Sequence, residues 1–89
     1  MNKRHEEQLW SRLDSLYANG MVFISYGELY HWYNAQRLAK APWRDVKSRW
    51  ESLLEEKGEP YVDPQIAEGP GGIAFFFSRN PRSLSKMAE

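Results

Sequence analysis

The sequence predicts a single α+β domain with three helices followed by a β-hairpin. Two observations predict it. Before Gly58, apolar residues recur at the three- and four-residue spacing of amphipathic helices. After Gly58, two β-prone runs are separated by a Gly-rich turn over residues 68–72. Helices that precede a strand pair are typical of the α+β class.

Length and composition exclude several classes of protein. The 89 residues fit one domain, and an aromatic share of 15% supplies enough apolar area to order residues 6–78. The chain has no cysteine, which excludes disulfides, thiolate metal sites and cysteine nucleophiles. Its start has no apolar run of the signal-peptide kind, and no segment has the roughly 20 apolar residues that span a bilayer. We therefore expect a cytoplasmic protein with no membrane contact.

The first helix is expected to run from Lys3 or Glu6 to Ala18. Its inward face carries Leu9, Leu13, Leu16 and Tyr17, with Trp10 at the edge. Gly20 ends it, because glycine adopts the left-handed conformation of a helix C-cap without steric cost. The apolar, β-prone residues 21–24 that follow are expected to form a short strand.

The second helix is expected to run from Tyr26 to about Leu38. Ser25 and Glu28 match a capping box, in which each side chain accepts a hydrogen bond from a free backbone N–H at the helix start. The residues expected to face inward are Leu29, Tyr30 and Tyr33.

The third helix is expected to run from Pro42 to Lys57, with Gly58 as its end. Proline suits the first helical position, where its missing N–H has no intrahelical partner. The apolar face comprises Trp43, Val46, Trp50, Leu53 and Leu54. Only residues 39–41 connect this helix to the second one, so the two must pack at an angle, as in a helix-turn-helix.

The hairpin is expected over Tyr61 to Phe77. Pro64 has no N–H to donate, so the first strand must be an edge strand or be bulged there. On the return strand, one face carries Ile73, Phe75 and Phe77, and the other carries Ala74 and Phe76. Residues 1–78 are therefore the expected domain, and the polar residues 79–89 an expected flexible basic tail.

Charge is distributed unevenly along the chain, although the net charge is zero. Residues 1–50 carry eight Lys/Arg against five Asp/Glu, and residues 51–77 carry one against six. Residues 78–89 carry three against one. The neutral total limits non-specific phosphate affinity, which grows with the number of phosphates neutralised. The helical half and the tail can still form a basic face.

The sequence offers no constellation for catalysis, metal binding or a cofactor. His5 and His31 are not at ligand spacing and have no neighbouring nucleophile. The acidic residues of the third helix and its end are expected to be a solvated face: Asp45, Glu51, Glu55, Glu56 and Glu59. The Gly-rich segment lies between two strands and does not open a helix, so it is a turn and not a phosphate loop.

The best candidate site is a set of polar residues on the third helix, Arg44, Lys47 and Ser48. In a helix-turn-helix, residues near the start of the second helix of the motif reach base edges in the major groove. Arginine matches the acceptors of guanine, and Lys or Ser reaches bases or phosphates. Further candidate contacts are Arg37, Lys40 and Arg49. The alternative is that these residues are only the solvated face that every surface helix has.

Aromatic residues have a different expected role. Trp43 and Trp50 lie seven residues apart on the apolar face of the third helix and are expected in the core. Phe76 points away from Phe75 and Phe77, and it is either a candidate partner or dimer surface or a residue that covers the tail. The turn of the hairpin carries Glu68 and no cation, which is unusual for a hairpin that touches phosphate. Either the hairpin stays off the DNA, or the basic tail with Arg79, Arg82 and Lys86 replaces it, or the domain binds protein instead.

The element order from residue 6 to 78 resembles the winged helix-turn-helix superfamily. The resemblance is carried by residues 21–24, the segment Ser25–Leu29, Pro42–Gly58 and Tyr61–Phe77. It implies a small bacterial or phage-type transcriptional regulator that reads double-stranded DNA with its third helix, without a cofactor. A homodimer would be needed for tight specific binding. The second hypothesis is a protein–protein interaction module with the same fold.

Overall fold

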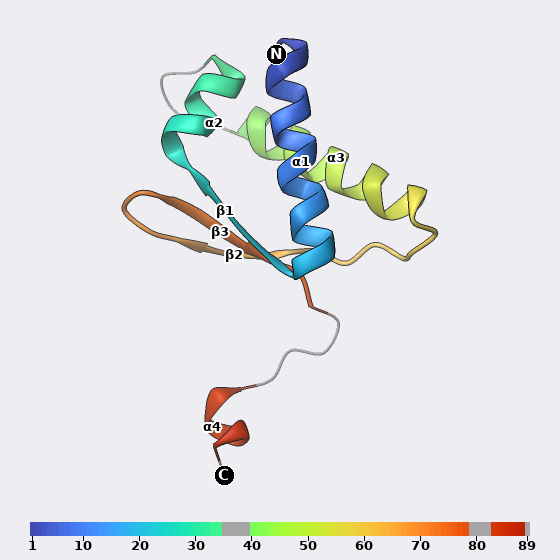
Figure 1. The fold of residues 1–89 in the computed structure, drawn as a ribbon, viewed down its shortest axis with the longest axis vertical. Helices are drawn as coiled ribbons and strands as arrows, with labels where there is room; N and C mark the ends of the chain where they lie inside the picture. The colour runs from blue at the N-terminus through green and yellow to red at the C-terminus, as the bar shows by residue number, and fades with distance from the viewer. Residues whose placement is uncertain (35–39, 79–82, 89) are drawn as a thin grey trace.

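The computed structural model describes residues 1–34, 40–78 and 83–88, which form a small α+β fold (Figure 1). Over these residues there are four helices and one three-stranded antiparallel sheet. The prediction of three helices missed the last one, a single helical turn within the expected tail, where Ser83 caps the turn. In chain order the elements are α1 (Lys3–Asn19), β1 (Met21–Ser25), α2 (Tyr26–Tyr33), α3 (Lys40–Glu56), β2 (Gln65–Glu68), β3 (Gly72–Phe76) and α4 (Leu84–Met87). Helices α1, α2 and α3 lie together over the sheet, and α4 stands apart from this body.

Helix α1 begins at Lys3, as the sequence predicts, ends at Asn19, one residue beyond the predicted end, and is capped at both ends. The side chain of Asn2 accepts a 2.8 Å hydrogen bond from the backbone N–H of His5. Gly20 adopts the left-handed conformation, with φ 79°, and its N–H donates to the carbonyl of Leu16. Strand β1 follows at once, so the predicted short strand is confirmed.

Only half of the predicted capping box forms at the start of α2 within the described residues. Ser25 Oγ accepts a 3.1 Å hydrogen bond from the N–H of Glu28. The carboxylate of Glu28 instead makes a 2.7 Å ion pair with Arg12 of α1. The Arg12 guanidinium offers this carboxylate a charged partner, and a hydrogen bond between charged groups is stronger than one to a neutral backbone N–H. Glu28 therefore joins two helices.

The prediction that α2 reaches Leu38 was wrong, because the helix ends at Tyr33. Asn34 is left-handed, with φ 48°, and its N–H donates to the carbonyl of His31. Asparagine tolerates this conformation, so it can end a helix as glycine does. The predicted inward face was also partly wrong: Trp32 is buried and Tyr30 is exposed.

Helix α3 begins at Lys40, two residues before the predicted start. Pro42 is its third residue, which is acceptable because N–H groups throughout the first turn lack intrahelical partners. Gly58, with φ 71°, follows the helix end as predicted.

The predicted first strand of the hairpin was too long, because β2 begins only at Gln65. The indole N–H of Trp50 donates a 2.9 Å hydrogen bond to the carbonyl of Val62, so this backbone group is satisfied by a side chain and not by a strand. Pro64 lies outside the strand. In the sheet β3 is central, in the order β1-β3-β2.

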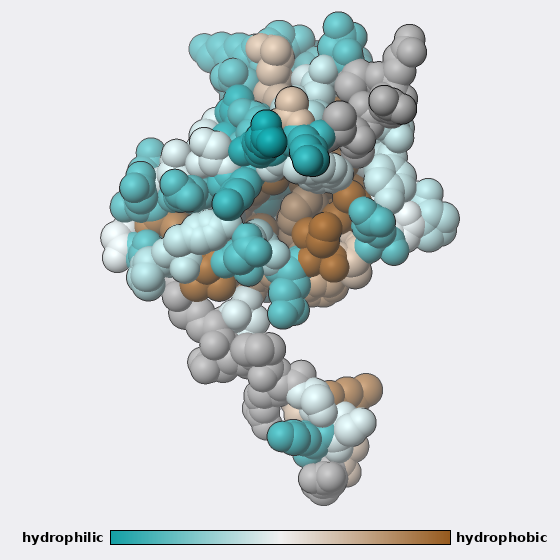
Figure 2. Space-filling model, turned by 180° about the vertical axis from the view of Figure 1, so that it is seen from behind, coloured by the Kyte–Doolittle hydropathy of each residue, from teal (hydrophilic) through white to brown (hydrophobic). Residues whose placement is uncertain are grey.

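The core lies between the helices and one face of the sheet. The predicted alternation on the return strand is confirmed: Ile73 and Phe75 are buried, and Phe76 is exposed on the other face. The buried apolar set is Leu9, Leu13, Leu16, Ile24, Leu29, Trp32, Val46, Trp50, Leu53, Leu54, Ile73 and Phe75. Trp43 packs against this core but is only partly buried. Seen from behind, hydrophilic side chains surround apolar surface near the middle of the body (Figure 2).

Candidate nucleic-acid interface

The first half of α3 carries a polar face turned away from the core. Lys40, Arg44, Lys47 and Ser48 are all exposed. Within the part of the chain that the structure describes, the side chains of Lys40 and Arg44 have no ion-pair partner. Arg44 and Ser48 are four residues apart, so they lie one turn apart on the same side of the helix. These residues are available to an external anion or base edge.

The charges of α3 run against its own macrodipole. Its first turn contains no acidic residue and its last turn no basic one. Lys40 and Arg44 instead stand near the positive N-terminal end, and Glu55 and Glu56 near the negative end. At exposed sites in the first and last turns, those of Lys40, Glu55 and Glu56, each such placement opposes the dipole by about 0.3–1 kcal/mol. The effect has fallen off at Arg44, in the second turn. Folding alone therefore does not favour cations at this end of α3. A phosphate bound there would favour them.

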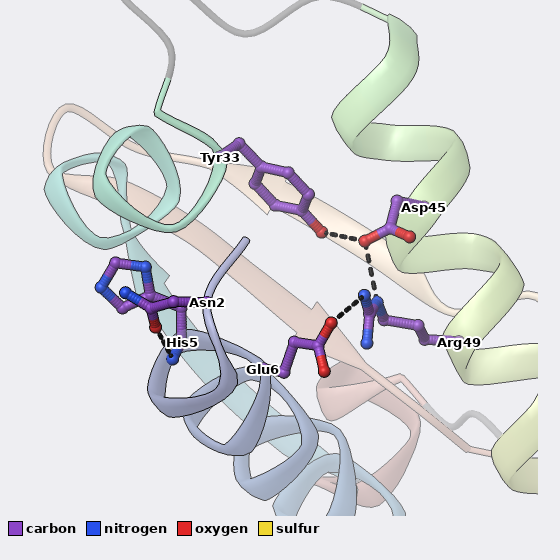
Figure 3. Close-up of polar contacts among 6 residues, drawn as sticks. All are labelled: Asn2, His5, Glu6, Tyr33, Asp45 and Arg49. Atoms are coloured by element: carbon purple, nitrogen blue, oxygen red, sulfur yellow. Dashed lines mark hydrogen bonds and ion pairs between the residues drawn. The ribbon is translucent and has the colours of Figure 1, made fainter.

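Arg49 differs from the other candidates because the fold already engages it (Figure 3). Its Nε donates a 2.8 Å hydrogen bond to Oδ2 of Asp45, and its Nη2 lies 3.7 Å from Oε1 of Glu6. The guanidinium also lies over the ring of Trp10, 5.5 Å from its centroid. The carboxylate of Asp45 and the ring of Trp10 hold Arg49 against the body.

Asp45 was predicted to be solvated, and this was wrong. It is half-buried and accepts a second hydrogen bond, at 2.7 Å, from the hydroxyl of Tyr33 on α2. Burial, the hydrogen bond and the charge of Asp45 together raise the pKa of Tyr33 well above its usual value. The phenol therefore stays protonated as a donor. A helix position alone could not reveal this contact, because the partner comes from another helix.

Lys47 lies at the edge of a groove and not on the outermost side of α3. Its Nζ is 5.9 Å from the centroid of the Tyr61 ring. The groove lies between α1, α3, the segment after α3, β2 and β3, and Lys47 is part of its wall. A lysine held over an aromatic ring keeps its charge accessible while its stem covers apolar surface.

Phe76 and Glu68 are both exposed, as the partner-surface hypothesis requires. The structure adds two apolar residues that the hypothesis missed. Met21 pairs with Phe76 across the strands and Phe23 pairs with Ala74, and both Met21 and Phe23 are exposed on the same outer face. The sequence could have revealed them, because successive side chains of β1 alternate between the two faces of the sheet. The buried Ile24 then places Met21 and Phe23 on the outer face.

The two histidines lie side by side, which their sequence spacing did not indicate. The ring centroids of His5 on α1 and His31 on α2 are 4.5 Å apart. Burial and the proximity of His31 lower the pKa of His5. Among the described residues no group of three or more His, Cys, Asp or Glu side chains is arranged to hold a metal ion.

Some of the predicted residues lie outside the described part of the chain. They are Arg37 of the candidate contact set and Arg79 and Arg82 of the basic tail. Lys86 of the tail lies in α4 and is exposed.

Comparisons of the chain with protein-family models, with curated proteins and with solved structures find no match. None of the described helices has the length and apolar character that crossing a membrane requires.

Proposed function

We propose that this chain is a winged helix-turn-helix protein that binds double-stranded DNA and regulates transcription. In this proposal α3 enters the major groove, Arg44 reads a base edge, and Lys40, Lys47 and Ser48 contact phosphates or bases. Arg49 is left out of the contact set because Asp45 and Glu6 hold it.

The arrangement of elements supports this fold assignment. Two helices separated by a short connection precede a β-hairpin, and the strand that precedes them, β1, joins the hairpin at β3. The sheet thereby fixes the hairpin beside the helix pair. The ion pairs and hydrogen bonds of Asp45 and Arg49 fix α3 relative to α1 and α2, so that its polar face points outward.

The reversed charge of α3 is the observation that carries the proposal. Lys40 opposes the helix dipole, and neither Lys40 nor Arg44 has an ion-pair partner within the described residues. An anionic partner would satisfy both cations and could accept from the N–H groups of the first turn, which lack intrahelical partners. The DNA backbone supplies such an anion every few ångströms.

The direct test is duplex binding at several salt concentrations, with a double variant, Arg44→Ala with Lys47→Ala. Wild type should bind at about 50 mM salt and weaken as salt rises, since bound cations release counterions from DNA. The double variant should lose most of this affinity. Lys57→Ala is the matched control, because it removes one lysine just beyond the far end of α3. No binding by wild type, or equal binding by the double variant, contradicts the proposal.

A second candidate function is protein binding through the outer face of the sheet. The exposed strip of Met21, Phe23 and Phe76 favours it, because apolar side chains gathered on one face are typical of partner surfaces. Its test is a pull-down that compares wild type with Phe76→Ala, on this outer face, and with Glu68→Lys, whose position pairs with the buried Ile73 on the other face. A partner lost with Phe76→Ala but kept with Glu68→Lys, in a chain that does not bind duplex DNA, would favour this function.

A further inference from the structure

A groove beside α3 is apolar and open. It has a volume of about 280 Å³ and is formed by α1, α3, the segment after α3, β2 and β3. Its wall includes Trp43 and Val46 of α3 and Ile66 of β2, and the side chain of Ile66 is 54% exposed. An apolar cavity of about 150 Å³ admits a ligand the size of benzene, so this groove has room for two aliphatic side chains.

The groove has acidic groups at its border. Asp63 lies in its wall and accepts a 2.7 Å hydrogen bond from the hydroxyl of Tyr61. Burial, this hydrogen bond and the charges of Asp63 and Glu51 raise the pKa of Tyr61 to about 12. Lys47 also lies in this wall, with its Nζ 5.9 Å from the centroid of the Tyr61 ring. The carboxylates of Asp63 and Glu51, which both act on Tyr61, outnumber this one cation, so a cationic occupant is favoured over an anionic one.

The end of the described chain has the complementary properties. We call residues 83–88 the arm. Ser83 accepts a hydrogen bond from the N–H of Lys86 and caps α4, which stands clear of its own body (Figure 1). Leu84 is 81% exposed and Met87 is 58% exposed, and their three-residue spacing puts both on one side of the helical turn. Residues 78–89 carry three Lys/Arg against one Asp/Glu.

We propose that the arm of one copy docks in the groove of a second copy of this chain. Leu84 and Met87 would enter the groove, and Lys86 would pair with the carboxylates at its border. Among the described residues of one chain, Ile66 of the groove and Leu84 and Met87 of the arm are exposed. The charge of Lys86 is opposite to that of Asp63 and Glu51 at the groove. Because each copy has one arm and one groove, reciprocal exchange closes a dimer with two equivalent contacts. This inference does not rest on DNA binding.

The absence of cysteine makes a clean cross-linking experiment possible. Two single variants of the full chain, Ile66→Cys and Leu84→Cys, are mixed and treated with a thiol oxidant. We expect a disulfide-linked dimer of one copy of each variant as the main product on a non-reducing gel. Met21→Cys mixed with Leu84→Cys is the matched control, because Met21 is 57% exposed but lies on the outer face of the sheet. It should give little product.

Three outcomes overturn the proposal. Equal cross-linking of the control shows that the arm has no preference for the groove, and no cross-linking of the first mixture shows that it does not dock there. An Ile66→Cys/Leu84→Cys double variant that links within one chain shows that each arm covers its own groove. Sedimentation gives an independent readout: wild type should dimerise, and Leu84→Asp should remain monomeric. No readout uses DNA, so the result is separate from that of the proposed function.

Discussion

Tyr33 and Arg49 donate to the same atom, Oδ2 of Asp45, at 2.7 Å and 2.8 Å. Tyr33 is the last residue of α2, and Arg49 lies in α3 and also reaches Glu6 of α1. One carboxylate oxygen thus joins two helices directly and a third through the guanidinium. Among the described residues, this contact joins the end of α2 to α3.

We expect Tyr33→Phe to lower the free energy of unfolding by about 1–2 kcal/mol, because it removes a hydrogen bond to a charged group. Urea denaturation measures the change. Tyr30→Phe is the matched control, since Tyr30 is exposed on the same helix, and it should change little. Equal effects of the two substitutions would contradict a structural role for the shared oxygen.

Trp50→Ala should lower the free energy of unfolding by about 3–5 kcal/mol. Trp50 is fully buried, donates its indole N–H to Val62 and packs edge-on against the ring of Phe77, with centroids 5.0 Å apart. Trp43→Ala, at a partly buried position of the same helix, should have a smaller effect in the same assay. A loss below about 1 kcal/mol at Trp50 would place it outside the core.

Gly72→Ala should destabilise the sheet by about 1–3 kcal/mol, the usual range for overpacking. A Cβ at Gly72 would lie 2.4 Å from the carbonyl oxygen of Ile24 on β1, which is backbone and cannot turn aside. Gly71→Ala is the control one residue away, because a Cβ there meets nothing within 4 Å. Thermal unfolding of both variants should show a large decrease in Tm for Gly72→Ala alone.

The pH dependence of stability should reflect His5. Its pKa in the folded chain lies below the ordinary value of 6.5, through burial first and then the charge of His31, with smaller effects of the terminal amino group and Arg4. The unfolded chain therefore binds more protons near this pH, so the free energy of unfolding should decrease as pH falls through 6.5. In His31→Gln the decrease should be shallower. A free energy of unfolding that increases as pH falls over this range would contradict the prediction.

Single substitutions on α3 should separate phosphate contact from base reading. Lys47→Ala should make the dependence of log affinity on log salt shallower by about one unit, if Lys47 neutralises one phosphate. Arg44→Ala should cost about 1–3 kcal/mol on a preferred sequence, with little effect on other sequences, if it binds guanine. Fluorescence anisotropy with two duplexes measures both. If Arg44→Ala weakens binding to both duplexes equally, Arg44 contacts the DNA backbone and not a base.

Local signals in the sequence predicted much of the fold. Gly20 and Gly58 ended their helices as expected, and the alternation around Phe75 fixed the two faces of β3. The failures had two causes. Asn34 ended α2 early through a local left-handed cap, and the indole of Trp50, from another element, took the carbonyl of Val62 that a longer strand would have used.

The candidate contact residues were identified from helix position alone, and for most of them position was enough to predict exposure. It was not enough for Arg49, because its two carboxylate partners and Trp10 come together only when α1 packs against α3. The groove and the proximity of His5 to His31 also depend on tertiary packing. No spacing within one segment encodes them.

The strand order has a consequence for how the chain acquires its fold. β1 comprises residues 21–25, and its partner β3 comprises residues 72–76, so almost the whole domain must be synthesised before β1 can pair. β2 cannot take the place of β3, because β3 lies between the two. On the ribosome, α1 to α3 therefore emerge before any sheet exists. Closure of this long loop should limit the folding rate, and a nascent chain stopped before residue 72 should expose β1 to chaperones.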